Sequence, residues 1–309
     1  MSLTFDSARI PNPHLTEDHL AWRDALRRFV DKEIMPYAED WDEAGHIPNE
    51  LWLRAAEVGL LGAGYPEEYG GMPTDSWHSW IIQEELSRVG VGGIAASLFV
   101  HSIGLPPVIN WGSAEMKANI APAVLRGESW ISLGITEPGG GSDVANLATT
   151  AVRDGDHFIV NGSKTYITGG MRANYVSTAV RTGGEGPTGV SMLLIPTDSE
   201  GFSRTRLDRK MGWWASDTAT LYFDNVRVPA DHIIGEENQG FKVIMTNFNN
   251  ERMGMAAAME AYGRVCLEEA VNWATERRTF GKRLADHQVI RHKIAMMKQK
   301  LNATQAYIR

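Results

Sequence analysis

Three consecutive glycines lie in the segment GITEPGGGSD, residues 134–143. Because glycine lets the backbone approach a ligand closely, this segment can bring NH groups to an anion, and Thr136 and Ser142 add hydroxyl donors. The chain has neither a G-x-G-x-x-G fingerprint after a strand nor a Walker P-loop. A nucleotide cofactor would therefore be bound in another way, although a loop of this kind alone is more often an ordinary turn.

Glu251 is the candidate for acid–base chemistry. At helical spacing it shares a face with the apolar residues Ile244, Phe248 and Met255. Burial disfavours an ionised carboxylate, so we expect the pKa of Glu251 to rise toward the range of a general base. The alternative is a structural ion pair, with Arg252 or Arg264 as the partner.

The end of the chain is basic, although the whole protein has a net charge of -8. Between Arg277 and Lys300 there are eight basic residues and one acidic residue, Asp286. Arginine suits bidentate binding of phosphate, so this stretch can contact the phosphates of a small ligand; the alternative is a solvated helix face. The acidic balance of the whole chain argues against nucleic-acid binding.

Two kinds of periodicity divide the chain. Apolar residues recur at helical spacing in 16–34, 51–58, 77–89, 115–125, 241–274 and 290–308. Alternating runs bounded by Gly, Pro or Asp predict strands at 151–153, 158–160, 175–181, 190–195 and 219–228. We therefore predict a multi-domain α and β protein, with an N-terminal helical domain (1–130), a central antiparallel β domain (131–238) and a C-terminal helical domain (239–309).

Several classes of protein are excluded by composition. No apolar run approaches the roughly 20 residues needed to cross a bilayer, and the N-terminus lacks the pattern of a signal peptide. The single cysteine, Cys266, excludes disulfide frameworks and cysteine-based zinc sites. We expect a cytoplasmic protein without membrane insertion or a metal site. The last helical pattern reaches Arg309 without a glycine or proline stop, so we expect this chain to be a fragment of a longer protein.

Six segments together resemble the acyl-CoA dehydrogenase family, and they extend over nearly the whole chain. They are GLLGAGYPEEYGG from Gly59, GITEPGGGSD from Gly134, NGSKTYITGG from Asn161, KMGWWASDTATLYFDNVRVP from Lys210, NFNNER from Asn247 and ERRTFGKRLADHQ from Glu276. The resemblance implies a flavin enzyme with helical, β and helical domains in that order. It also implies FAD-dependent α,β-dehydrogenation of an acyl-CoA thioester to a trans-2-enoyl-CoA.

The resemblance also implies which residues contact FAD. The loop around Thr136 would lie against the flavin pyrimidine edge, and the segment around Tyr166 would pack near N5, where the hydride arrives. The family usually has tryptophan at the position of Tyr166; tyrosine keeps a planar aromatic ring but is smaller and adds a polar hydroxyl. The Arg277 segment would contact FAD phosphates and adenine, often across a dimer interface. The implied FAD residues are Leu133, Ile135, Thr136, Ser142, Tyr166, Ile167, Thr168, Arg277, Thr279, Phe280, His287 and Gln288.

The catalytic glutamate of the family occupies one of two chain positions. The isovaleryl-CoA type places it immediately before an arginine, as in Glu251-Arg252, so the resemblance implies Glu251 as the base. The other position would follow Arg309. Ser142, Asn249 and Arg252 match positions near the thioester and the CoA moiety.

Further implications concern partners and competing functions. The resemblance implies an electron-transfer flavoprotein as electron acceptor, a homodimer or homotetramer, and a role in fatty acid or branched-chain acid catabolism. The alternatives within the same fold are an acyl-CoA oxidase, a flavin-dependent monooxygenase and a nitroalkane-oxidase-like enzyme. A non-enzymatic, DNA-associated flavin protein is a remote alternative, because the chain is acidic. The sequence does not reveal the acyl-chain length or branching.

Overall fold

The computed structural model describes residues 3–308, which form two compact units. Unit 1 consists of Met1–Lys32, Asp75–Gly90 and Arg252–Arg309. Unit 2 consists of Glu33–Thr74 and Val91–Glu251. The division into three sequence domains stays a prediction, and each compact unit is described by itself.

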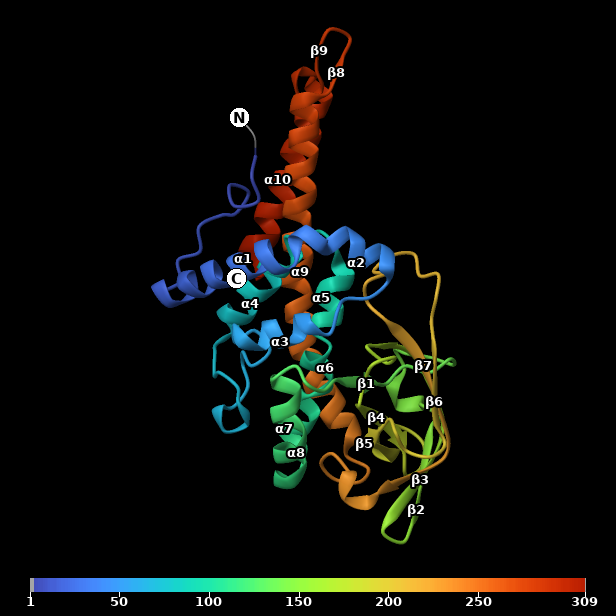
Figure 1. The fold of residues 1–309 in the computed structure, drawn as a ribbon. Coiled ribbons are helices and arrows are strands. Elements are labelled where there is room, and N and C mark those ends of the chain that lie inside the picture. Colours follow the sequence, from blue (N-terminus) through green and yellow to red (C-terminus); the bar gives the residue numbers. More distant parts are fainter. Residues whose placement is uncertain (1–2, 309) are drawn as a thin grey trace. The chain divides into compact units, whose positions relative to one another are not determined.

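Unit 2 contains a seven-stranded sheet (Figure 1). Its strands are β1 (Ile131–Gly134), β2 (Thr150–Asp154), β3 (His157–Thr168), β4 (Tyr175–Arg181), β5 (Val190–Pro196), β6 (Phe202–Arg206) and β7 (Thr218–Pro229). The order is β1-β4-β2-β3-β7-β6, and β5 pairs with β4. The sheet was predicted to be antiparallel. Most of its pairs are antiparallel, but β4 pairs in parallel with β1 and β2, so the sheet is mixed.

Short helices accompany the sheet in unit 2. They are α2 (Ala38–Ala44), α3 (Glu50–Glu57), α5 (Gly92–Leu98), α6 (His101–Gly104), α7 (Pro106–Trp111), α8 (Ala114–Leu125) and the first turns of α9 (Gly240–Glu276). In Figure 1, α7 and α8 lie side by side. Their apolar residues, such as Val108 and Ile120, share one buried cluster with Leu194 of β5 and Ile244 of α9. This cluster fixes the start of α9 against the sheet.

A separate apolar cluster lies between the long strands. Phe158 and Val160 of β3 pack with Leu221 and Val228 of β7, and all four side chains are fully buried. The pairing of β3 with β7 is interrupted by register shifts, one of which falls between Lys164 and Ile167. Such bulges redirect side chains, and this one precedes the predicted flavin segment.

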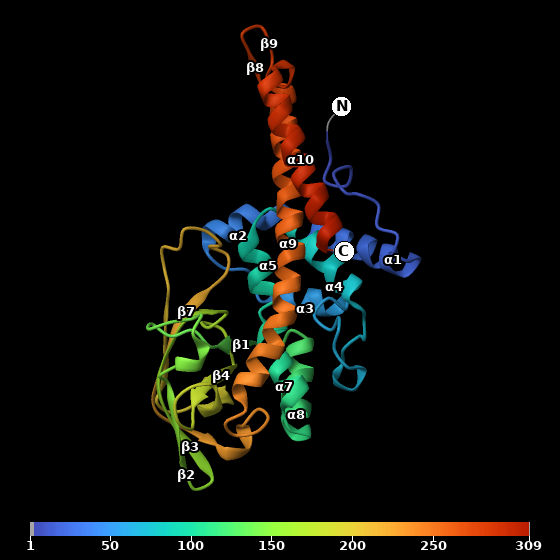
Figure 2. The ribbon, with the colours of Figure 1, turned by 180° about the vertical axis from the view of Figure 1, so that it is seen from behind.

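Unit 1 is built from helices. They are α1 (Glu17–Glu33), α4 (Ser76–Ser87), the part of α9 that follows Glu251, and α10 (Gln288–Ile308), and a hairpin of β8 (Arg278–Thr279) and β9 (Lys282–Arg283) joins α9 to α10. Both views show α10 running beside α9 (Figures 1 and 2). Gly263 permits this close approach, because a Cβ there would lie 2.6 Å from Cδ2 of Leu301.

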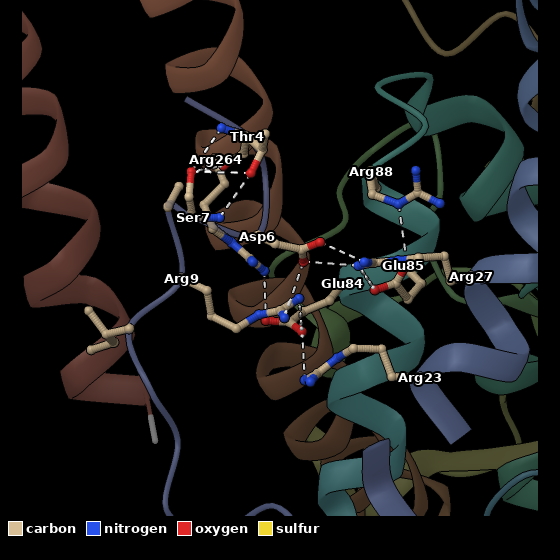
Figure 3. Close-up of polar contacts among 12 residues, drawn as sticks. Thr4, Asp6, Ser7, Arg9, Arg23, Arg27, Glu84, Glu85, Arg88 and Arg264 are labelled. Carbon is tan, nitrogen blue, oxygen red and sulfur yellow. Dashed lines mark hydrogen bonds and ion pairs between the residues drawn. The ribbon is translucent and has the colours of Figure 1, made fainter. Parts of the chain in front are cut away.

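A buried ionic cluster ties together the segments of unit 1 (Figure 3). The fully buried Arg264 guanidinium donates to Glu84 Oε1 at 2.6 Å, and Arg9 and Arg23 lie 3.2 and 3.3 Å from Glu84 Oε2. Burial raises the pKa of Glu84, but the positive charges of Arg264, Arg9 and Arg23 outweigh it and hold the pKa below its usual value. Arg264 is therefore committed to Glu84 in this cluster, and its considered role as the ion-pair partner of Glu251 is wrong.

No single helix within residues 3–308 has both the length and the apolar character needed to cross a membrane. The pair Gly92–Leu98 and His101–Trp111, which is bent by 50°, meets these criteria only when its two parts are taken together. Leu98 and Leu105 of this pair are fully buried.

Because His101 of α6 is buried, we expect the unfolding free energy of unit 2 to fall at acid pH. Its Nε2 lies 3.0 Å from the carbonyl oxygen of Leu61, and burial lowers its pKa from 6.5 to about 4. The unfolded chain therefore takes up a proton below pH 6.5 that the folded chain accepts only near pH 4, so stability falls over this window. We expect the wild type to lose up to about 3 kcal/mol of unfolding free energy relative to His101→Asn between these pH values.

Urea unfolding at a series of pH values measures this difference. His46→Asn is the matched control, because His46 is exposed and should leave the acid slope of the wild type unchanged. Equal slopes for the wild type and His101→Asn would contradict the assignment.

Candidate active site

Two of the segments predicted to contact flavin lie against each other in unit 2. The backbone NH of Thr165 donates to the carbonyl oxygen of Thr136 at 2.8 Å. The hydroxyl of Ser132 donates to the carbonyl oxygen of Thr168, also at 2.8 Å. These two hydrogen bonds join the β1 region to β3 on both sides of Tyr166, at Thr165 and at Thr168.

The Tyr166 ring is exposed because its backbone is unusual. Tyr166 has a φ of 58°, in the left-handed region, and its side chain is 70% exposed. A tyrosine rarely adopts this conformation, and it is most often found where the surrounding structure imposes it for a functional reason. The side chain of the next residue, Ile167, is buried, so Ile167 can offer only its backbone to a ligand.

The loop after β1 carries the hydroxyls of Thr136 and Ser142, and β3 ends at the hydroxyl of Thr168. Among the described residues, no side-chain hydrogen bond engages the hydroxyls of Thr136, Ser142 or Thr168. A Cβ at Gly141 would lie 3.1 Å from Cγ2 of Thr136, whereas a Cβ at Gly139 or Gly140 would meet nothing within 4 Å. Glycine at 141 therefore allows the loop to fold back over Thr136. The exposed Tyr166 ring and these hydroxyls lie on two segments that are joined by hydrogen bonds, and they are groups that a planar ligand with polar edges, such as a flavin, would contact.

A buried ion pair that the sequence analysis missed anchors the same loop. Lys164 Nζ lies 2.7 Å from Glu137 Oε1 and 3.2 Å from the carbonyl oxygen of Ile135. The Glu137 carboxylate also accepts backbone NH groups of Ala148 at 2.6 Å and Thr149 at 2.9 Å. Burial lowers the pKa of Lys164 to about 8, although Glu137 opposes this shift. The pair therefore ties the start of the loop to β3 and to the segment before β2.

Glu251 is half-buried, on the ninth helix. Its Oε1 accepts a hydrogen bond of 2.8 Å from Nδ2 of Asn247, which lies one turn earlier. The predicted apolar stripe holds toward the N-terminus, where Ile244 is buried and Phe248 half-buried. It was wrong toward the C-terminus, because Met255 is 62% exposed.

The other two predicted substrate residues on α9 are exposed. They are Asn249, which belongs to unit 2, and Arg252, which begins unit 1. Both side chains are accessible to a ligand, whereas the neighbouring Asn247 is buried.

The predicted phosphate-binding residues gather on the β8–β9 hairpin of unit 1 and on the short segment that follows it. Phe280 and Gly281 form its tip, with φ angles of 51° and 78°, and Phe280 is 96% exposed. Thr279 Oγ1 lies 3.3 Å from His287 Nε2, which links the hairpin to the segment before α10. Arg277 and Gln288 are exposed. A solvent-facing aromatic ring and an arginine on one projecting hairpin fit contacts to a ligand outside unit 1.

A separate polar cluster in unit 1 joins the first turns of α1 and α4. His19 Nε2 and His78 Nδ1 lie 3.0 and 2.9 Å from Asp75 Oδ1, and these three residues have the composition of a metal site. However, the backbone NH of Thr16 donates to His19 Nδ1 at 3.0 Å, which places the ring proton on Nε2, facing Asp75. His19 then has no lone pair for a cation. We interpret the cluster as a hydrogen-bonded connection between two helix N-termini, in which Asp75 caps α4.

Comparison with known proteins identifies the class to which this fold and site belong. Models of the acyl-CoA dehydrogenase N-terminal, middle and C-terminal domains match residues 16–128, 132–226 and 238–309. The chain belongs to the acyl-CoA dehydrogenase family. It is therefore an enzyme, an oxidoreductase and a flavoprotein with FAD as its cofactor, and the predicted fold class is confirmed.

Individual relatives agree with this assignment. The acyl-CoA dehydrogenase AFT10-1 of Alternaria alternata is 39% identical over 303 residues, which cover 93% of this chain and 70% of that protein. The crystal structure of a probable acyl-CoA dehydrogenase from Mycobacterium abscessus has 48% identity and a TM-score of 0.93, covering 95% of this chain and 78% of that one. A glutaryl-CoA dehydrogenase from Mycobacterium smegmatis in complex with FADH2 has 29% identity and a TM-score of 0.88, covering 95% and 75%. The chain is thus shorter than these relatives.

Proposed function

We propose that the protein removes the α-proton and the β-hydrogen of an acyl-CoA thioester, giving a trans-2-enoyl-CoA, with Glu251 as the general base. The observation that supports the proposal is the junction of the Thr136 loop with the end of β3, which holds together the two segments that bear Thr136 and the exposed Tyr166 ring. Family membership supplies the class of reaction.

Each part of the chain has a distinct task in this reaction. The thioester carbonyl group of the substrate makes the neighbouring α-proton more acidic. The carboxylate of Glu251 accepts this proton. FAD, when bound, supplies the two-electron acceptor to which the β-hydrogen leaves as hydride. The hydroxyls of Thr136 and Thr168 can donate to ligand oxygens and nitrogens, and the Tyr166 ring covers a planar surface.

The remaining residues are proposed to bind rather than to react. Leu133, Ile135, Ile167 and Ser142 contribute to the flavin contacts, and the hairpin that bears Arg277, Thr279, Phe280, His287 and Gln288 binds FAD phosphates and adenine. The exposure of this hairpin supports contact with the FAD of a second copy, in a homodimer or homotetramer. Ser142, Asn249 and Arg252 are proposed to contact the acyl-CoA.

The physiological setting belongs to the same proposal. An electron-transfer flavoprotein would reoxidise the flavin, and the reaction would serve fatty acid or branched-chain acid catabolism in the cytoplasm. An acyl-CoA oxidase would instead deliver the electrons to oxygen, so oxygen reactivity distinguishes it from a dehydrogenase.

Anaerobic titration with acyl-CoA esters tests the proposed function. We expect the purified protein to be yellow, to release FAD on denaturation, and to lose its oxidised flavin absorbance with at least one ester of a panel that varies in chain length and branching. Rapid reoxidation by air would favour the oxidase. Release of FMN, or no bleaching by any ester, would contradict the proposal.

A further inference from the structure

Asn247 connects the proposed base to the sheet. Its side chain is 7% exposed, and its Nδ2 atom donates both to Glu251 Oε1 at 2.8 Å and to the carbonyl oxygen of Ile103 at 3.1 Å. A primary amide nitrogen carries two hydrogens, so both are used. The two acceptors lie on different elements, α9 and α6, and one side chain therefore sets the distance between them.

The α6 end of this connection is held rigidly. The carbonyl oxygen of Gly104 accepts the hydroxyl of Ser177, a β4 residue, at 2.8 Å. A Cβ at Gly104 would lie 2.6 Å from the carbonyl oxygen of Ile131 in β1, so glycine is required for α6 to pack this closely on the strand. β1 leads directly into the Thr136 loop. Ile103 thus belongs to the same packed body as the proposed flavin contacts.

We propose that Asn247 is the positioning residue of the Glu251 base, a role that rests on the proposed function. Glutamate has three rotatable side-chain bonds, and a half-buried glutamate on a helix can move its carboxylate by several ångströms. A donor fixed to α6 restricts the carboxylate to one orientation, and efficient proton transfer depends on such placement. The amide is neutral, so it orients the carboxylate without neutralising its charge as an arginine or lysine would.

Two substitutions remove the donor while keeping the shape. Asn247→Leu removes the donor alone, whereas Asn247→Asp replaces it with a carboxylate that cannot donate when ionised and that repels Glu251. Asn247→Gln retains an NH group on a longer side chain. Thr246→Val is the matched control, because Thr246 is exposed and, among the described residues, its hydroxyl bonds only to the carbonyl oxygen of Lys242 in the same helix, at 2.9 Å. Thermal unfolding and FAD content establish that each variant is folded and loaded.

The rate constant of flavin reduction in single-turnover stopped flow is the decisive quantity. We expect it to fall about tenfold in Asn247→Leu and Asn247→Asp, with the apparent Kd for acyl-CoA unchanged, and to recover at least partly in Asn247→Gln. A base displaced from its proton affects the chemical step, whereas a merely structural change would alter Kd, FAD content or unfolding temperature instead.

The same measurement on Glu251→Gln distinguishes failure of the positioning role of Asn247 from failure of the proposed base, Glu251. If Glu251→Gln blocks reduction but the donor-less Asn247 variants reduce their flavin at the wild-type rate, the positioning role is overturned and the proposed base stands. If Glu251→Gln is itself as fast as the wild type, both are overturned. If the rate constant of flavin reduction falls as much in Thr246→Val as in the Asn247 variants, the positioning role is also overturned.

Discussion

Replacing Glu251 by glutamine is expected to slow reduction of the bound flavin by acyl-CoA at least ~10²-fold, and up to ~10⁴-fold, because positioned general bases contribute by this order. Glutamine preserves the length and the planar end of the side chain, and its carbonyl oxygen can still accept the amide of Asn247. It cannot take up the α-proton. Binding of FAD and of acyl-CoA should therefore be retained while the chemical step is lost, which anaerobic stopped-flow spectroscopy measures directly.

A second glutamate on α9 provides the comparison for this result. Glu269 is exposed, so Glu269→Gln changes the same charge on the same helix and should leave the reduction rate within about twofold of the wild type. If Glu251→Gln reduces its flavin as fast as Glu269→Gln, another carboxylate is the base. Glu251 would then have a structural role only.

The elements whose apolar residues face one side were predicted from the sequence. The alternation at 175–181 and 219–228 corresponds to β4 and β7, and the helical spacing at 115–125 corresponds to α8. In β7 and α8 the periodic pattern largely reflects one buried and one accessible face, whereas all inner residues of β4 are buried and its β-forming composition identified it. The boundaries agree to within one or two residues.

Several short elements were not predicted. β1 lies parallel to β4, and three of its four residues are buried, so its sequence ISLG shows no alternation. α5 begins with two glycines and buries Ile94 and Leu98, and its seven residues are too few for a helical period. β6 was missed for the opposite reason, because it is an edge strand whose side chains are largely accessible. Tertiary packing, rather than local pattern, determines these segments.

In the candidate site, too, some residues were predicted from the sequence and others became apparent only in the structure. Thr136, Tyr166 and Glu251 were predicted because their surroundings resemble a family, and they stay predictions, but the groups that hold them were not predicted. Lys164 and Glu137 are 27 residues apart and come from a strand and a loop, and Asn247 meets the carbonyl of Ile103 across 144 residues. A single lysine in a strand or an asparagine in a helix has no distinctive spacing. Only the folded chain shows that they support the site.

The Lys164–Glu137 pair illustrates why such supporting groups matter. Lys164 is fully buried and Glu137 is 9% exposed, so each charge depends on the other for stabilisation in a medium of low polarity. Glu137 is in addition the acceptor for two backbone NH groups at the end of the loop. The conformation of the Thr136 loop and the stability of unit 2 therefore depend on the same contact.

Lys164→Met is accordingly expected to lower the unfolding free energy by ~3–5 kcal/mol, because it leaves the Glu137 carboxylate buried without its cation. Urea unfolding measures this loss, and FAD released on dilution should rise, since the Thr136 loop loses its support. The double variant Lys164→Met/Glu137→Gln should recover part of the stability, because glutamine removes the uncompensated charge and its oxygen can still accept a backbone NH.

Lys117→Met is the control, since Lys117 makes no side-chain hydrogen bond or ion pair to any residue that the structure describes. A loss no larger than that of Lys117→Met, or a double variant less stable than Lys164→Met, would show that the buried pair does not hold the loop.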